Sequence, residues 1–318
     1  MSGGYLAHGL TLALAWFAVA NGLASAAVAL AARRLVADDR SRTAAWWLAL
    51  RCLPALASIA FVAAVFVPSY VRFEPRETIE GFDVTLTLCA GAAIALLLAS
   101  AARGARAWRR AARQASVWMR SARPLEQTAG VPAFTLGAAP APLMALVGVF
   151  SPRVFVSQRL VDALTGDELA ATLAHEAWHA RSRDNLKRLA MRLLPDALAG
   201  TAAAAAIEQR WASAAEHAAD RGATGGDAAA RCTLASALVK VARMVPAAPP
   251  ALEPISTLVG GSDLASRIES LLSDRPAAGG SRRLLWPGAA ALAAAAIVYA
   301  PALRAVHEIT ELLVNSLP

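Results

Sequence analysis

Four stretches of this chain are apolar over enough residues to cross a lipid bilayer, and they limit its fold more than any other feature. A membrane-spanning helix needs about 20 apolar residues. Hydrophobic residues make up 57% of the 318 residues and charged residues only 17%, which is too apolar for an ordinary soluble domain of this length. We therefore expect a mainly α-helical membrane protein with four transmembrane helices, over about residues 5–32, 50–71, 84–102 and 284–303.

Basic residues predict how these spans are oriented. Four arginines follow the first span and seven follow the third, whereas the loop after the second span carries four acidic residues against two arginines. Loops rich in Lys and Arg face the cytoplasm. We therefore expect a multi-pass protein of the plasma (inner) membrane with residues 105–283 in the cytoplasm. Basic loops beside membrane spans, which contact anionic lipids, explain the net charge of +8. The lipid bilayer is therefore an expected partner, and no nucleic acid is expected.

The spans divide the chain into parts with different expected structures. Residues 1–104 should hold three transmembrane helices, residues 105–283 a cytoplasmic domain, residues 284–303 the fourth helix and residues 304–318 a short extracytoplasmic tail. In the cytoplasmic part, short apolar runs separated by prolines predict a small antiparallel sheet. These runs cover residues 134–136, 144–150 and 153–156.

Helices should follow the sheet. Thr165 and Glu168 have the spacing of a capping box, so a helix should begin there and continue to about Arg181. Residues 197–207 are apolar but too few to cross a bilayer, which favours a buried helix or one at the membrane surface. Further helices are expected through Trp211 to Arg221 with a stop at Gly222, from Asp227 to about Met244, and over residues 263–272.

The cytoplasmic part carries the sequence His175-Glu176-Ala177-Trp178-His179. Residues four apart share one face of a helix, so His175 and His179 can bind one metal ion. Glu176 is then placed to act as general base on a metal-bound water. This pattern predicts a zinc metalloendopeptidase with one Zn²⁺ per chain and a protein or peptide as substrate.

A catalytic zinc usually has three protein ligands, and the third should come from a later helix. Glu216 is the preferred candidate, with Asp220 on the same face to accept a hydrogen bond from a ligand histidine. His217 is the competing ligand, although it points about 100° away from Glu216. Arg221 and His217 are both candidates to assist the oxyanion.

Two other groups of residues have simpler interpretations. Arg183 and Asp184 are expected to form a solvated helix end, with a functional ion pair as the alternative. The three cysteines include no C-x-x-C pair, which argues against a thiolate zinc site. They are expected to be buried free thiols.

Three segments resemble the integral-membrane peptidases of the BlaR/MecR type. The segment from His175 to Asn185 is similar to their zinc signature, residues 216–220 to their third-ligand motif, and residues 151–157 to the strand before it. HtpX-like membrane peptidases share these motifs. The resemblance implies a zincin-like α+β (gluzincin) domain between the third and fourth spans. It also implies that a strand formed by Arg153, Val154, Phe155 and Val156 holds substrate by strand addition.

The resemblance suggests what such an enzyme would cut. BlaR/MecR-type peptidases suggest a transcriptional repressor in signal transduction, and HtpX-like peptidases suggest quality control of membrane proteins. The family's antibiotic sensors carry a large extracellular domain after the last span, which is not expected here. The alternatives are a non-catalytic signalling scaffold and a transporter. A transporter would need charges within its spans, and Arg51 lies near the cytoplasmic end of its span, where it can reach the interface.

Overall fold

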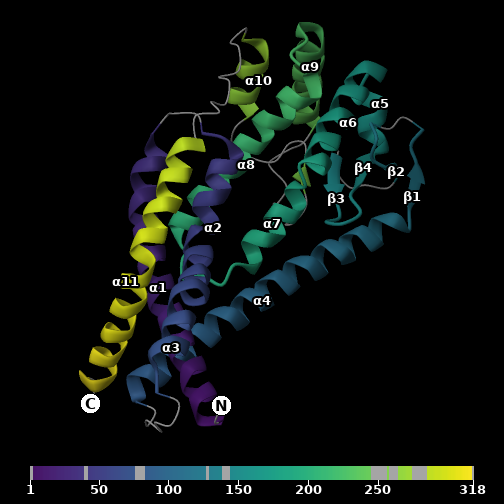
Figure 1. Cartoon of the computed structure of the whole chain (residues 1–318). Helices are drawn as coiled ribbons and strands as arrows, with labels where there is room; N and C mark the ends of the chain where they lie inside the picture. The colour runs from purple at the N-terminus through teal and green to yellow at the C-terminus, as the bar shows by residue number, and fades with distance from the viewer. Residues whose placement is uncertain are drawn as a thin grey trace.

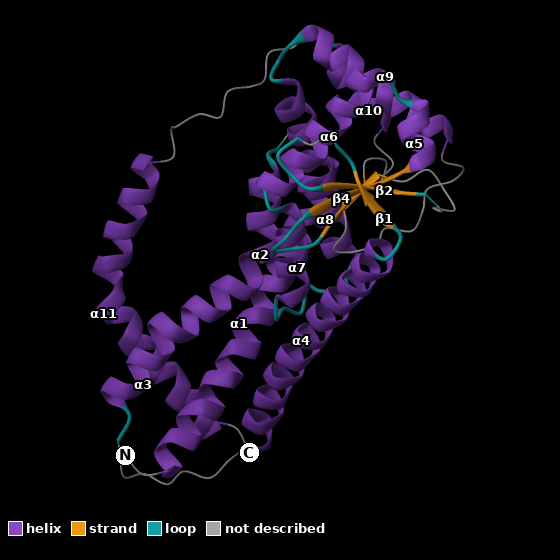
Figure 2. Ribbon diagram, turned by 90° about the vertical axis from the view of Figure 1, so that its right-hand side faces the viewer, coloured by secondary structure: helices purple, strands orange, loops and turns teal. Residues whose placement is uncertain are grey.

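Apolar helices form one end of the molecule, and a small sheet with shorter helices forms the other (Figures 1 and 2). This computed structural model describes residues 3–38, 42–75, 83–126, 129–137, 144–244, 256–257, 264–273 and 285–316. The side chains of residues 3, 256–257, 285–298 and 315–316 lie outside the description.

Three of the described helices are long and apolar enough to cross a membrane. The first is α1 (Gly3–Ala37), and the third is α4 (Val84–Met119). The second is continuous through α2 (Ala44–Phe61), a π-helical turn η1 (Val62–Phe66) and α3 (Val67–Phe73). These helices agree with the first three predicted spans and indicate insertion in a membrane. The predicted fourth span falls mostly on residues whose side chains are not described, so it stays a prediction.

The π-helical turn has a local cause in the sequence. Pro68 follows it at the start of α3 and has no backbone N–H, so it cannot bond to the carbonyl of Ala64 one turn earlier. That carbonyl instead accepts a hydrogen bond from the hydroxyl of Tyr299 on α11 (Leu285–Ser316), at 2.7 Å. Nearby, the Ser69 hydroxyl donates to the carbonyl of Leu303 at 2.7 Å. The proline therefore frees a group that helps to attach α11 to α3.

The sheet is mixed, not antiparallel as predicted. It comprises β1 (Ala122–Pro124), β2 (Ala133–Leu136), β3 (Met144–Val147), β4 (Arg153–Ser157) and β5 (Ser256–Thr257), in the order β1-β2-β4-β3-β5. β3 and β4 are antiparallel neighbours, whereas β2 and β4 are parallel. Five residues, 148–152, connect β3 to β4. β4 lies between β2 and β3 and runs parallel to β2.

The helices around the sheet follow the predicted signals closely. They are α5 (Gln158–Ala163), α6 (Gly166–Arg181), α7 (Asp184–Leu193), α8 (Ala202–Thr224), α9 (Ala228–Met244) and α10 (Leu264–Leu272). The capping box of Thr165 and Glu168 at the start of α6 is confirmed. The prediction that Gly222 ends α8 is wrong, because the helix continues to Thr224 and Gly225 takes the left-handed conformation at its end. Buried Leu146, Val154 and Leu173 belong to the core that joins the sheet to α6 and α9.

Helix α8 joins the two ends of the molecule (Figure 1). Its N-terminal half packs against α1 and α2, where Ile207 and Trp211 are buried with Val28 and Trp47. The preceding loop docks on α1, since the side chain of Asn21 bonds to the backbone of residues 195 and 197. The C-terminal half of α8 packs against α6. One helix therefore contacts both the membrane helices and the helix with the two predicted histidine ligands.

The prediction that Arg51 reaches toward the membrane interface is wrong. Its side chain is buried, with Nη1 3.0 Å from Asp196 and Nε 2.8 Å from Glu208 on α8. A buried guanidinium is tolerated only with such partners. The prediction failed because Asp196 and Glu208 are about 150 residues away in sequence and meet Arg51 only in the folded chain. These ion pairs attach α8 and the loop before it to α2, in addition to the apolar packing of α8 against the same helix.

Candidate metal centre

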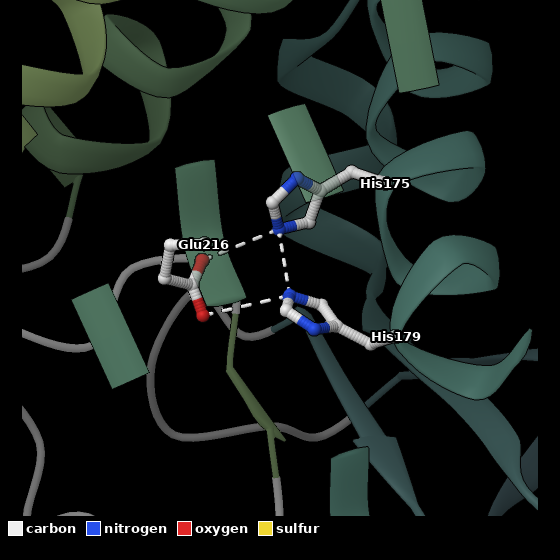
Figure 3. Close-up of side chains that lie close together, drawn as sticks. All are labelled: His175, His179 and Glu216. Atoms are coloured by element: carbon white, nitrogen blue, oxygen red, sulfur yellow. Dashed lines mark hydrogen bonds and ion pairs between the residues drawn. The ribbon is translucent and has the colours of Figure 1, made fainter. Parts of the chain in front are cut away.

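Two histidines from α6 and one glutamate from α8 point toward one another (Figure 3). The Nε2 atoms of His175 and His179 are 3.1 Å apart. Glu216 lies 3.3 Å from His175 Nε2 through one carboxylate oxygen and 3.5 Å from His179 Nε2 through the other. All three side chains are buried. The cluster could hold a metal ion.

The spacing of these donor atoms fits zinc. Zinc binds histidine nitrogen and carboxylate oxygen at about 2.0–2.2 Å with tetrahedral angles, which separates neighbouring donors by about 3.3 Å. The three distances here are 3.1, 3.3 and 3.5 Å. No side-chain rearrangement is therefore needed to accommodate an ion of that size.

Each histidine has a carboxylate behind it. Nδ1 of His175 lies 2.9 Å from Asp220, and Nδ1 of His179 lies 2.8 Å from Asp184. The hydrogen bond of His179 Nδ1 to Asp184 fixes the tautomer of that ring and leaves its Nε2 free to bind a metal, and Asp220 is placed at ion-pair distance from the corresponding nitrogen of His175. Asp220 contacts His175 from the same face of α8 as Glu216. Asp184 is buried at the start of α7, so its interpretation as a solvated helix end is wrong.

Arg267 on α10 completes the cluster, and the sequence analysis missed it. Its guanidinium donates to both carboxylate oxygens of Asp220, at 2.7 and 2.8 Å, and lies 3.0 Å from Glu216. Burial lowers the pKa of Arg267, but the bond to Asp220 and the charge of Glu216 outweigh burial and raise it. A signal was present in the sequence, since Arg267 shares the apolar face of its helix with Leu264 and Leu271.

Glu176 is fully buried, and neither carboxylate oxygen has a hydrogen-bond partner among the described residues. Burial raises the pKa of this carboxyl, and the neighbouring histidines oppose the shift. A buried carboxylate without partners is costly. Glu176 is close to His175 and His179, and water bound to a metal at these histidines would supply a hydrogen for its carboxylate.

The charges around the cluster also favour a dication. The carboxylates are Glu176, Asp184, Glu216 and Asp220, and the cationic side chains paired with them are Arg267 and Lys187. Two negative charges are left for a divalent ion to offset. Burial would lower the pKa of His179, but the charge of Glu216 and the bond to Asp184 raise it to about 10. Without a metal, a proton on His179 therefore supplies part of the positive charge that the site requires.

Other candidates lie away from this cluster. His217 turns toward Ser266, 3.4 Å away, and Arg221 is exposed, so neither lies beside the three donor atoms. Cys52 and Cys89 are half-buried and Cys232 is exposed, so the expectation of buried thiols does not hold.

The expected substrate-binding strand is not open to a substrate. The segment from Arg153 to Val156 forms most of β4, which pairs with β2 on one side and β3 on the other. Val154, Phe155 and Val156 are buried. A substrate strand needs an unpaired edge, so strand addition at these four residues is excluded. The error arose because the strand order depends on chain crossings that local sequence does not specify.

Two close contacts hold α6 and the residues that follow it in place. Asn185 donates from its side-chain nitrogen to the carbonyls of Leu146 and Gly148, each at 3.0 Å, and this ties the segment after α6 to β3. Gly222 of α8 lies against the ring of Trp178, which is inside the zinc pattern on α6. Any side chain at residue 222 would overlap that ring. The missing Cβ therefore lets α8 approach α6 closely enough to present Glu216.

Comparison with known proteins agrees with this chemistry. Residues 106–260 match the family model of peptidase family M48, and the matched segment includes His175, His179 and Glu216. Among curated proteins, no relative matches the chain. The family match and the three converging donor atoms support a metallopeptidase of family M48, of a type that is generally zinc-dependent.

Proposed function

We propose that this chain is a membrane-embedded zinc endopeptidase that cuts proteins close to the membrane. The observation that carries the proposal is the convergence of His175 Nε2, His179 Nε2 and the Glu216 carboxylate beside the buried carboxylate of Glu176, which has no hydrogen-bond partner in the described part of the chain. Three protein ligands and an adjacent general base are the parts of a hydrolytic zinc site.

The residues have separate roles in this proposal. His175, His179 and Glu216 hold one zinc ion, which supplies a Lewis acid that lowers the pKa of water and polarises the peptide carbonyl. Glu176 takes the proton of the attacking water at its carboxylate and passes it to the leaving amine. Asp220 and Asp184 keep the two imidazoles in the tautomer with Nε2 unprotonated.

Strand β3 is the proposed binding site for a substrate segment. This strand packs against α6, and Asn185 connects it to the segment after the zinc pattern. Among the described residues, its outer edge pairs with β5 at two positions, Ala145 with Thr257 and Leu146 with Ser256. We expect a substrate segment to pair in extended form with this edge by displacing β5, in place of the addition to β4 that the sequence suggested.

The membrane context limits which proteins are reached. α8 carries Glu216 and packs against α1 and α2, so the cluster lies near the membrane helices. The arginine distribution favours a cytoplasmic position for residues 105–283. A membrane-proximal protein segment on that side is therefore the proposed substrate class, and both a repressor of the BlaR/MecR-type pathway and damaged membrane proteins of the HtpX-like type belong to it.

A comparison of wild type with Glu176→Gln tests the proposal. The variant keeps all three ligands, so both proteins should bind one zinc ion at the cluster. Cleavage should fall about 10²–10⁴-fold, because general-base catalysis is lost. Metal content of the purified full-length chains and comparative proteomics of the producing cells measure the two quantities. Asp162→Asn, an exposed carboxyl on α5, is the matched control.

Two results would contradict the proposal. One is no stoichiometric zinc at this cluster after reconstitution of the wild type. The other is unchanged processing in cells that carry only Glu176→Gln, which would favour a signalling scaffold.

A further inference from the structure

A second cluster of metal-binding side chains lies far from the peptidase site. Glu74, His307 and Glu311 each offer one donor atom, and these atoms lie within 4.8 Å of one another. Glu74 follows the last turn of α3, and the other two residues lie on the C-terminal part of α11. In both views this part of the molecule is at the end opposite the sheet (Figures 1 and 2).

The geometry of α11 brings two of the donors together. His307 and Glu311 are four residues apart, so they share one face of the helix. The same spacing places His175 and His179 at the peptidase site. The ring of His307 is stacked on that of Phe73, with centroids 5.6 Å apart and planes at 26°. Phe73 therefore supports the imidazole next to Glu74.

Within the cluster, His307 and Glu74 lie at ion-pair distance without a hydrogen bond between them. His307 Nδ1 lies 3.8 Å from the Glu74 carboxylate, which is too long for a hydrogen bond. The Glu74 side chain is only 6% exposed, and that of His307 is 23% exposed. Two carboxylates at this separation repel each other, more strongly where water is partly excluded. The C-terminal carbonyls of α3 add negative potential at the same point. A cation between the three groups would relieve both effects.

We propose that Glu74, His307 and Glu311 bind a divalent transition-metal ion such as Zn²⁺. One imidazole nitrogen and two carboxylate oxygens suit such an ion, and imidazole disfavours Mg²⁺ and Ca²⁺. Water would complete the coordination, because His307 and Glu311 are half-buried. The ion would join α3 to α11 beside the contacts of Ser69 with Leu303 and of Trp16 with Thr310.

This site is independent of the proposed peptidase activity. It lies on the side of the bilayer that the arginine distribution predicts to be extracytoplasmic, whereas the peptidase cluster should face the cytoplasm. Its ligands come from α3 and α11, and those of the peptidase cluster from α6 and α8. Ions outside the cell could then strengthen the contact between α3 and α11 without exchange with the catalytic ion.

Zinc stoichiometry of the purified full-length chain tests the proposal. The chain is equilibrated with Zn²⁺ alone in detergent, and bound metal is measured by elemental analysis and calorimetry. Wild type should bind two ions. His307→Ala and Glu311→Gln should each lose one ion, with affinity at the second site lowered by more than about 100-fold, because loss of a ligand exceeds loss of an outer hydrogen bond. Glu308→Gln, an exposed neighbour on α11, should bind two.

A variant of the peptidase site separates this proposal from the first. His175→Ala with His179→Ala should still bind one ion, and addition of Glu311→Gln should abolish that binding. Glu311→Gln is the milder change and keeps the test valid if His307→Ala fails to fold. No ion in the variant that carries His175→Ala and His179→Ala, or an ion in that variant that persists when Glu311→Gln or His307→Ala is added, would overturn the proposal. Failure of the peptidase proposal alone would leave this second ion in place.

Discussion

Nδ1 of His179 lies 2.8 Å from the carboxylate of Asp184, which is also held by Lys187 at 2.8 Å. The aspartate is the first residue of α7, and the histidine lies near the end of α6. Two consecutive helices are thus joined by the same bond that orients a proposed metal ligand. This relationship leads to a first prediction about metal affinity.

Asp184→Asn should weaken zinc binding about 10–100-fold, as removal of an outer partner of a ligand histidine generally does. The amide retains an acceptor oxygen but loses the charge that raises the basicity of the imidazole. Calorimetric titration with Zn²⁺ measures the change, and Asp162→Asn on α5 is the control. An affinity equal to that of wild type would mean that Asp184 serves only to connect α6 and α7.

Arg267→Gln should destabilise the folded chain by about 3–5 kcal/mol, because it leaves Asp220 and Glu216 buried with less positive charge. Arg267→Lys should have a smaller effect, since it keeps the charge but loses the paired N–H groups. Thermal unfolding in detergent measures both variants. A Gln variant as stable as wild type would show that water compensates the two carboxylates.

Gly222→Ala should cost about 1–3 kcal/mol, the usual range for overpacking, because the added carbon overlaps the Trp178 ring. Combination with Trp178→Ala should remove the penalty, and a double-mutant cycle measures that coupling. Gly166→Ala on α6 is the matched control, since a Cβ added there would meet nothing within 4 Å. Equal penalties for residues 166 and 222 would contradict the assigned contact.

Glu168 should make the fold sensitive to acid. Burial raises the pKa of this carboxyl, but Lys240 at 2.7 Å and the backbone N–H of Thr165 lower it from 4.5 to about 2. Because the folded-state pKa is the lower one, the stabilisation is complete above about pH 4.5 and is lost as the pH falls toward 2. The effect should be about 1–2 kcal/mol, reduced by the exposure of Lys240.

Glu168→Gln tests this acid sensitivity. The variant should be less stable than wild type at neutral pH, and the difference between the two should shrink below about pH 4.5. Melting temperatures at several pH values provide the measurement. A difference in melting temperature that stays constant from pH 7 to pH 3 would show that the charge of Glu168 does not contribute to stability. Only its hydrogen bond in the helix cap would then contribute.

The features that could be predicted from sequence are those that depend on neighbours along the chain. Apolar length gave the first three spans, and the capping box of Thr165 and Glu168 gave the start of α6. The spacing of His175 and His179 placed both rings on one helix face. Asp184 and Arg267 were missed because their roles depend on how α7 and α10 pack onto α6 and α8. The same applies to the pairing of β4 on both sides and to the partners of Arg51.

The passage of α8 from the membrane helices to the metal cluster has a consequence for which peptide bonds can be cut. Between Ala202 and Glu216 the helix rises about 20 Å, at 1.5 Å per residue. Ile207, Trp211 and Ala215 on this part of α8 pack with α1 and α2, and Glu208 is paired with Arg51, so the position of Glu216 relative to these helices is fixed. The candidate metal cluster is thus held at a set position relative to α1 and α2. In the proposed peptidase, a substrate would therefore have to bring an extended segment to a position fixed by the packing of α8 on the membrane helices.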